Sequence, residues 1–144
     1  MEHMIIEIGC NQDVTFLLSK YNKTKEVIWE NDKNTYIVTA KSNGSIIGFA
    51  FVFRRNIPVP VENIKEDFIN VIEIFNEDER GSGVGTALVQ EIIKKAKNDN
   101  IYQVRAYCDI NNIASHYLWL KNGFGISPVK IKEDIVGSYA TFGL

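Results

Sequence analysis

The chain has few of the residues that build metal sites or disulfide frameworks. It holds two cysteines, Cys10 and Cys108, and two histidines among 144 residues. The cysteines lie far apart, without the close spacing that zinc ligands show. We therefore expect no metal, and free thiols are typical of a reducing cytoplasm.

Long apolar runs and an excess of one charge are also missing. No apolar stretch approaches the ~20 residues that a membrane-spanning helix needs, and the N-terminus lacks the residue order of a signal peptide. The net charge is -2, without a basic cluster, which gives no reason to expect nucleic acid as a partner. We expect a cytoplasmic protein that binds no membrane and folds as one domain over residues 1–144.

The most informative stretch joins a strand to a helix through three glycines. Residues 71–75 are apolar except for Glu73, and Gly81, Gly83 and Gly85 follow at alternate positions. The residues after them repeat apolar side chains at helical spacing. Glycine lets the backbone approach a ligand closely, and a helix N-terminus offers unpaired N–H groups. With Arg80 beside it, the loop predicts an anion site for a phosphorylated cofactor.

Spacing separates the known kinds of phosphate loop. A Walker loop ends in Gly-Lys-Ser/Thr, whereas here Gly85 is followed by Thr86 and Ala87. A Rossmann fingerprint needs a glycine at the position of Thr86. The pattern that fits is Arg-x-x-Gly-x-Gly at Arg80, Gly83 and Gly85, which resembles the pyrophosphate motif of the GNAT superfamily of acetyl-CoA-dependent N-acetyltransferases. A connection that binds no ligand, or a nucleotide site in an unrelated fold, is the alternative for the loop alone.

A second motif resembles the same family. In the family an Asn, a small residue three positions later and a closing Gly-Phe mark a helix, and here these are Asn112, Ser115, Gly123 and Phe124. The motif comes at the usual distance from the first, with one predicted strand between. The resemblance covers residues 46–124 well and the two ends only in outline. It implies a GNAT-like α/β (α+β) fold, with a mixed, mostly antiparallel central sheet of about six to seven strands flanked by helices.

The remaining sequence pattern agrees with that order of elements. We expect strands at residues 4–8, 35–41, 46–55, 71–75 and 103–108, a strand near Ile126, and a last strand at 135–142. Helices are expected after Asn11 or Asp13, from Val84 to Ala96, and after Asn112. The turn Asn43-Gly44 predicts a hairpin, and residues 22–34 are not assigned.

The resemblance implies acetyl transfer from acetyl-CoA, the acetyl donor, to a primary amine that attacks it directly in a ternary complex. Its implied cofactor-binding residues are Arg80, Gly81, Ser82, Gly83, Val84, Gly85 and Thr86 for the pyrophosphate, the backbone of Ile74 and Phe75 for the pantetheine arm and acetyl oxygen, and Asn112, Ser115 and Trp119 from the second motif. The implied partner is a small-molecule or protein amine, and a homodimer is left open.

The catalytic acid is not evident, because Trp119 occupies the position of the family's usual tyrosine. An indole N–H donates a hydrogen bond but keeps its proton at neutral pH. Tyr117 points to nearly the opposite side of the helix, so we expect it in the core or at the surface. His116 shares part of the face of Trp119 but is more often a plain polar residue. Tyr107 on the preceding strand is our candidate acid.

Glu73 is the candidate base, since a carboxylate in an apolar strand needs a polar cavity or a cation such as Arg105. A cross-strand ion pair or an edge position is the alternative for this residue. Because the usual acid is missing, a second function stays open, namely a catalytically weak acyl-CoA-binding sensor or interaction module of the same fold.

Acidic residues in two segments of the sequence bear on the choice of acceptor. The segments that border the acceptor cleft in the family contain the acidic residues Glu26, Glu30, Asp32, Glu62, Glu66 and Asp67, with Tyr21 and Trp29 as apolar walls. Carboxylates there would suit a cationic amine, such as a polyamine or an aminoglycoside. A solvated acidic face is the alternative.

Overall fold

The computed structural model describes residues 4–20, 34–57, 64–75 and 83–144. Its elements are β1 (Met4–Ile8), α1 (Asn11–Lys20), β2 (Thr35–Ser42), β3 (Ser45–Asn56), β4 (Lys65–Ile74), α2 (Val84–Asn98), β5 (Gln103–Asp109), α3 (Ile113–Lys121), β6 (Gly125–Ile131) and β7 (Asp134–Gly143). The order agrees with the one expected from the sequence. The main difference is β4, which begins at Lys65, six residues before the start of the strand expected at 71–75.

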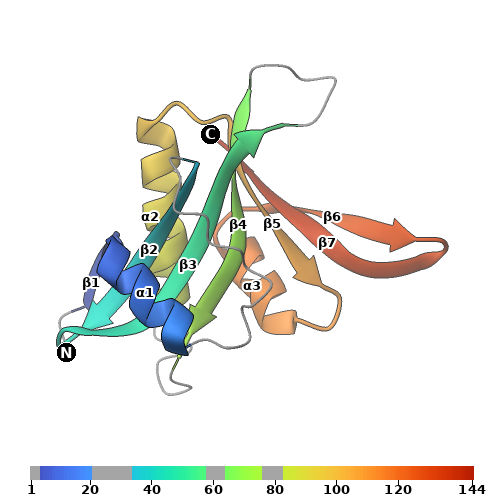
Figure 1. Cartoon of the computed structure of the whole chain (residues 1–144). Helices are drawn as coiled ribbons and strands as arrows, with labels where there is room; N and C mark the ends of the chain where they lie inside the picture. Colours follow the sequence, from blue (N-terminus) through green and yellow to red (C-terminus); the bar gives the residue numbers. More distant parts are fainter. Residues whose placement is uncertain (1–3, 21–33, 58–63, 76–82) are drawn as a thin grey trace.

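The strands form one 7-stranded sheet in the order β1-β2-β3-β4-β5-β7-β6. Every neighbouring pair is antiparallel except β4 and β5, which are parallel. A parallel pair needs a crossover connection, and α2 provides it. Figure 1 shows α1 on one face of the sheet and α2 and α3 on the other. The expected mixed, mostly antiparallel central sheet of six to seven strands flanked by helices is confirmed.

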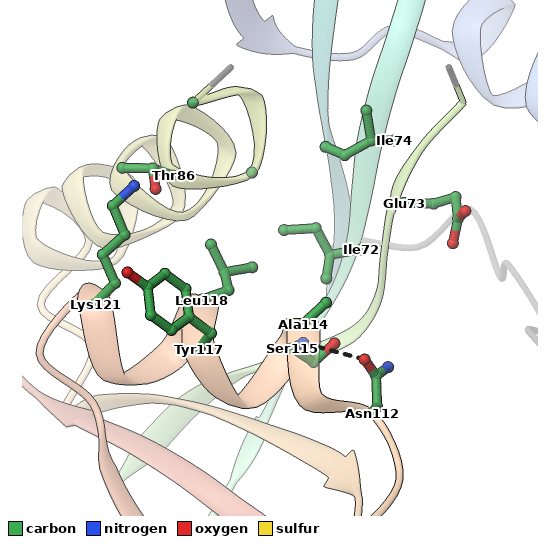
Figure 2. A pocket seen from close by; sticks show the side chains of 12 residues that line it. Ile72, Glu73, Ile74, Thr86, Asn112, Ala114, Ser115, Tyr117, Leu118 and Lys121 are labelled. Atoms are coloured by element: carbon green, nitrogen blue, oxygen red, sulfur yellow. Dashed lines mark hydrogen bonds between the residues drawn. The ribbon is translucent and has the colours of Figure 1, made fainter. Parts of the chain in front are cut away.

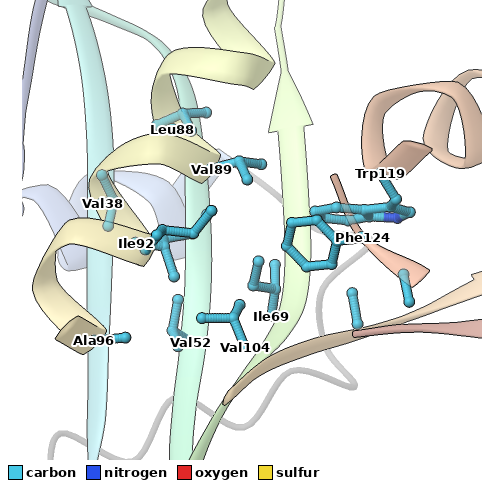
Figure 3. Close-up of a cluster of buried hydrophobic side chains, with 14 of the residues drawn as sticks. Val38, Val52, Ile69, Leu88, Val89, Ile92, Ala96, Val104, Trp119 and Phe124 are labelled. Atoms are coloured by element: carbon cyan, nitrogen blue, oxygen red, sulfur yellow. The ribbon is translucent and has the colours of Figure 1, made fainter. Parts of the chain in front are cut away.

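The main core lies between α2 and the centre of the sheet. Leu88, Ile92 and Ala96 of α2 are fully buried against side chains of β2 to β5 (Figure 3). Fully burying one such large aliphatic side chain contributes ~1.5–3 kcal/mol, so this contact holds α2 firmly on the sheet. A smaller core on the other face joins Val14 and Leu17 of α1 to aromatic residues of β3.

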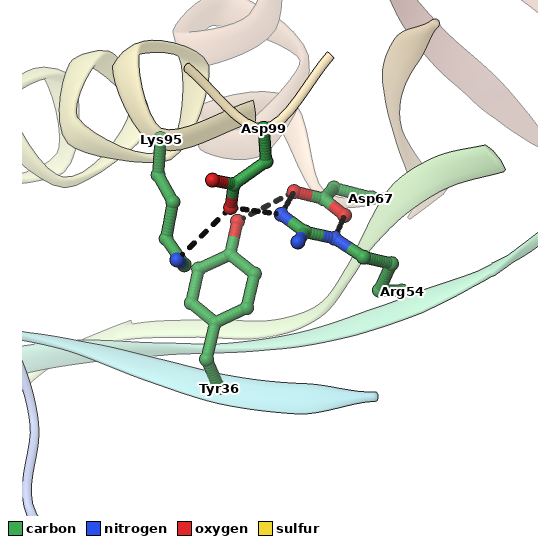
Figure 4. Close-up of polar contacts among 5 residues, drawn as sticks. All are labelled: Tyr36, Arg54, Asp67, Lys95 and Asp99. Carbon is green, nitrogen blue, oxygen red and sulfur yellow. Dashed lines mark hydrogen bonds and ion pairs between the residues drawn. The ribbon is translucent and has the colours of Figure 1, made fainter. Parts of the chain in front are cut away.

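A buried ionic cluster fixes the C-terminal end of α2. Asp67 is fully buried and accepts hydrogen bonds from Arg54 Nε at 2.9 Å and Tyr36 Oη at 2.8 Å. Arg54 also pairs with Asp99 at 2.9 Å, just past the helix, and Lys95 pairs with Asp99 at 3.0 Å (Figure 4). Burial, with Asp67 next to it, raises the pKa of Tyr36, so its phenol stays protonated. The cluster therefore anchors the C-terminal end of α2, whereas its N-terminal end lines the pocket described below.

Strands β4 and β5 separate halfway along their length. They pair only over Glu66–Ile69 and Gln103–Ala106. In the β3–β4 ladder Val52 pairs with Ile69 and Phe51 with Val71, so Asn70 is an extra residue on β4. Such a β-bulge bends a strand and increases its twist. The bulge follows directly after the last β4–β5 pair, and β4 then runs away from β5.

Among the described residues, no helix is long and apolar enough to cross a membrane.

Candidate functional site

A pocket of about 480 Å³ lies where β4 leaves β5. Its walls come from the end of β4, the first turn of α2 and the outer side of α3 (Figure 2). The lining residues are Ile72, Glu73, Ile74, Gly83, Gly85, Thr86, Asn112, Ala114, Ser115, Tyr117, Leu118 and Lys121. The two sequence motifs, which are separated in the chain, therefore meet at one cavity.

The first turn of α2 presents unpaired donors to this pocket. Gly83 is the N-cap with φ 92°, and no side chain caps the helix among the described residues. The N–H groups of Val84, Gly85 and Thr86 belong to this first turn and have no partner within the helix. A Cβ on Gly83 would meet nothing within 4 Å, so the backbone conformation, rather than space, requires glycine. The turn contains no acidic side chain, which suits an anion.

Part of the predicted loop, Arg80, Gly81 and Ser82, lies outside the described residues. The cation that the structure does place at the pocket is Lys121, from the last turn of α3. Figure 2 shows its side chain extending toward Thr86 at the start of α2. Lys121 was not among the site residues predicted from the sequence. It stands two residues before Gly123, but the direction of its side chain depends on how α3 is rotated against α2.

Asn112 and Ser115 shape the N-terminus of α3 and also line the pocket. The Asn112 side chain accepts a hydrogen bond from the Ser115 N–H at 3.1 Å, which is an N-cap interaction. A Cβ on Gly85 would lie 3.4 Å from Leu118 Cδ1, an ordinary contact distance. The start of α2 therefore lies next to α3, with room for no more than about a methyl group between Gly85 and Leu118.

The structure places Trp119 in the core instead of the pocket. Its side chain is 2% exposed, and its ring centroid lies 5.0 Å from that of Phe124 (Figure 3). Tyr117, which we expected in the core or at the surface, lies at the surface with 70% of its area exposed, and it also lines the pocket. The two residues do lie on opposite sides of α3, as helical geometry requires. Trp119, predicted as a cofactor contact, is therefore corrected to a core residue.

The hydrogen bonds of the β4 backbone indicate which of residues 74 and 75 can contact the cofactor through its peptide group. The Phe75 N–H donates to Ile47 O at 2.9 Å, so it is used in pairing with β3. Since hydrogen-bonding direction alternates along an antiparallel ladder, the peptide groups of Ile72 and Ile74 point toward the space that β5 has left. The Phe75 backbone is therefore corrected from a cofactor contact to a contact with β3. Ile72 is a further candidate for the backbone contact with the cofactor, which the sequence did not predict.

The two candidate catalytic residues do not meet in the pocket. Glu73 lines it, and its side chain points to the side of β4 opposite Ile72 and Ile74 (Figure 2). Tyr107 is not among the lining residues, and its Oη donates to Val136 O at 3.3 Å. Desolvation and the nearby Asp109 raise the pKa of Tyr107, which makes it a weaker acid. The geometry leaves Glu73 as the carboxylate at the pocket.

His116 is engaged away from the pocket lining. Its Nδ1 lies 3.1 Å from Cys108 Sγ and 3.0 Å from Asn112 O. Burial raises the pKa of the Cys108 thiol, so the sulfur stays protonated. We interpret this contact as local support for the start of α3.

Two of the carboxylates that suggested a cationic acceptor are buried and already paired. Glu66 and Asp67 are both 0% exposed. Arg55 and Arg105 bind Glu66, and Arg54 binds Asp67. These two residues are therefore corrected from an acceptor surface to structural ion pairs. Glu26, Glu30, Asp32 and Glu62, with Tyr21 and Trp29, lie outside the described residues.

No group of three or more His, Cys, Asp and Glu side chains that could hold a metal ion occurs in the part of the chain that the structure describes.

Comparison with known proteins identifies the family. The model of the Acetyltransferase (GNAT) family matches residues 8–124. No curated protein matches the chain. The fold is similar to a GNAT family acetyltransferase from Elizabethkingia anophelis with acetyl-CoA bound, with a TM-score of 0.72, 21% identity and 100% of both chains covered.

Two further solved structures show the same fold. Arabidopsis thaliana NAA60 in complex with acetyl-CoA matches with a TM-score of 0.76 and 12% identity, over 99% of both chains. The IAA acetyltransferase from Bacillus cereus matches with a TM-score of 0.73 and 17% identity, over 99% of this chain and 100% of the other. With the family model covering most of the chain, this protein belongs to the GNAT acetyltransferase family.

Proposed function

We propose that this protein is an N-acetyltransferase that moves the acetyl group of acetyl-CoA to a primary amine by direct attack in a ternary complex. One observation carries the proposal: the N-terminus of α2, which no side chain of the described residues caps, opens into a pocket that reaches the separation of β4 and β5. Similar structures from Elizabethkingia anophelis and Arabidopsis thaliana hold acetyl-CoA, which supports the choice of ligand.

The pocket residues fit the two chemical halves of that ligand. The N–H groups of Val84, Gly85 and Thr86, with the Lys121 ammonium, suit a pyrophosphate. Each hydrogen bond to a charged group contributes ~1.5–3 kcal/mol, so three or four of them would hold it. Ile72, Ile74 and Leu118 give an apolar wall for the aliphatic arm. When bound, acetyl-CoA supplies the thioester carbonyl that the amine attacks.

Donor and acceptor would reach the reaction centre from opposite faces of the sheet. The pocket lies between α2 and α3, whereas the Glu73 side chain points to the face that carries α1. An ammonium that approaches from this face meets the Glu73 carboxylate first. Glu73 would accept its proton, directly or through water, and the peptide groups of Ile72 and Ile74 would orient the acetyl group.

Trp119 favours a second candidate function. A buried indole stands where the family usually has a tyrosine, so no phenol at this position can protonate the leaving thiolate. A protein that binds acyl-CoA without turnover, as a sensor or interaction module, would tolerate that substitution. We prefer the enzyme because Glu73 and the separated strands remain in place.

Calorimetric titration with acetyl-CoA, with ATP and NAD as controls, tests the cofactor. We expect saturable binding of acetyl-CoA alone. Amines are then added, and release of the CoA thiol is followed with a chromogenic thiol reagent. Acceptor-dependent release supports the enzyme, and binding without release would favour the sensor. Absence of acetyl-CoA binding would refute both.

A further inference from the structure

The face of the sheet opposite α2 and α3 carries a cationic and aromatic surface over β3, β4, β5 and β7. Phe68 pairs with Arg105, and Tyr107 pairs with Tyr139. Cross-strand partners and alternate residues share a face of a sheet, so Arg55, which pairs with Glu66, belongs to the same side. Figure 1 shows no helix of the described part over β5 and β7 on this side. We call these five residues, Arg55, Phe68, Arg105, Tyr107 and Tyr139, the open face.

Cations outnumber anions around Arg55 and Arg105 in the described part of the open face. The Glu66 carboxylate accepts hydrogen bonds from Arg55 Nε at 2.9 Å, Arg105 Nη2 at 2.7 Å and Gln103 Nε2 at 2.8 Å. Burial acts to raise the pKa of Glu66, but these hydrogen bonds lower it overall, so the group is ionised. Among the described residues, two guanidinium groups face one carboxylate at this end of the open face and leave one positive charge there. Asp109 alternates with Arg105 and Tyr107 on β5, so its negative charge lies on the same side at the other end, beyond Tyr107. Solvent meets the cations, since the side chains are 45% exposed in Arg55, 19% in Arg105 and 0% in Glu66.

The aromatic rings hold the two guanidinium groups in place. Arg55 Cζ lies 4.1 Å from the centroid of the Phe68 ring, and Arg105 Cζ lies 4.6 Å from that of Tyr139. Arg105 already uses both Nε and Nη2 on Glu66, whereas Arg55 contacts Glu66 through Nε. The outer edge of the stacked Arg55 guanidinium matches the geometry of a carboxylate. Little side-chain freedom would be lost when an anion binds here.

The open face lies next to the point where β4 and β5 separate, on the same side of the sheet as the Glu73 side chain. Arg105 stands one residue before the last β4–β5 pair, and Tyr107 is the first residue of β5 beyond it. On β4, Glu73 follows Phe68 by five positions, or about 15 Å of strand at ~3.3 Å per residue. An extended peptide also spans ~3.3–3.6 Å per residue. A peptide with its amino group at Glu73 would therefore place its fifth residue, four steps along the chain, near Arg105.

We propose that the open face binds the anionic part of the acceptor, and that the acceptor is a peptide with an acidic side chain about four residues from its free amino terminus. This inference rests on the proposed acetyltransferase function and specifies its acceptor. It replaces the cationic acceptor that the sequence suggested, because Glu66 is buried and neutralised by arginines.

Two peptides that differ by one charge test the proposal. They are Ala-Ala-Ala-Ala-Glu-Ala and Ala-Ala-Ala-Ala-Gln-Ala, both amidated at the C-terminus, and thiol release is measured at saturating acetyl-CoA and low salt. We expect kcat/KM to be about tenfold higher for the acidic peptide, with the difference shrinking as salt screens the charges. Spermidine provides the cationic comparison and is expected to react more slowly than the acidic peptide.

Two variants separate the open face from a general charge effect. In Arg55→Gln the difference between the peptides should disappear, while the Kd for acetyl-CoA, measured by calorimetry, stays at the native value. Glu66 keeps Arg105 and Gln103 as partners in this variant. Lys95→Gln removes one positive charge next to Asp99 on the other face, and it should keep the preference for the acidic peptide.

Equal kcat/KM for the two peptides would overturn the proposal, and so would a faster reaction with spermidine or a preference that survives Arg55→Gln. The comparison of the peptides uses the native protein, so it does not depend on the folding of a variant. Thiol release without an acidic preference refutes this inference alone. If no amine supports release, the proposed function fails and this inference fails with it.

Discussion

Replacing Gly83 by alanine tests the cofactor site with a minimal change. Gly83 has φ 92°, and a Cβ there would meet nothing within 4 Å. The substitution therefore acts through the backbone alone. Holding a residue with a side chain in such a conformation costs ~1–3 kcal/mol. No packing opposes a rotation toward negative φ, so we expect the start of α2 to relax and turn its N–H groups away from the pocket.

The expected loss of affinity follows from those donors. Losing one hydrogen bond to a charged phosphate costs ~1.5–3 kcal/mol. At ~1.4 kcal/mol per tenfold change, the Kd for acetyl-CoA should rise about 10-fold to 100-fold. Calorimetry measures this Kd, and urea denaturation of the same samples measures the free energy of unfolding.

Gly44→Ala is the matched control. Gly44 lies in the β2–β3 turn with φ 81°, and its Cβ would also meet nothing within 4 Å. This variant should lose a similar ~1–3 kcal/mol of stability but keep the native Kd. If both variants bind acetyl-CoA with native affinity, the first turn of α2 does not hold the cofactor, and the reasoning is refuted.

Three further predictions concern other parts of the molecule. Lys121→Gln should weaken acetyl-CoA binding and reduce its dependence on salt, whereas Lys94→Gln, a change at an exposed position of α2, should leave the Kd unchanged; equal calorimetric curves would contradict this. Trp119→Phe should keep measurable thiol release and change the free energy of unfolding by less than ~1 kcal/mol, because lost packing is offset by removal of an N–H without a partner among the described residues. Glu66→Gln should cost about 3 kcal/mol at pH 7 in urea denaturation, at the lower end for a broken buried pair, because Arg105 and the half-exposed Arg55 lose the charge of their buried partner. The lowered pKa of Glu66 means that its contribution is present above the ordinary value of 4.5 and is lost as the pH falls below it, so this variant should lose less stability than the native protein between pH 5 and 3.

The sequence alone determined what depends on near neighbours in the chain. The four-residue spacing of Leu88, Ile92 and Ala96 predicts the buried side of α2, because one face of a helix has one environment. Asn43 and Gly44 predict the β2–β3 turn, because positive φ suits these two residue types, and both have it in the structure. The two glycine-containing motifs pointed to the family for the same reason: each is a local pattern of backbone and side chains.

The tertiary structure decided what depends on distant contacts. A helical wheel places Tyr117 and Trp119 on opposite sides of α3, but only packing against Phe124 selects which of them is buried. From the sequence alone, the acidic residues Glu66 and Asp67 at the start of β4 are predicted to lie at the surface. Strand pairing instead brings Arg55 and Arg105 to Glu66 and allows its burial. The β-bulge that separates β4 from β5 has no local signal either. It follows from the register with β3, which is set by side chains far apart in the chain, because strand pairing must satisfy the whole sheet at once.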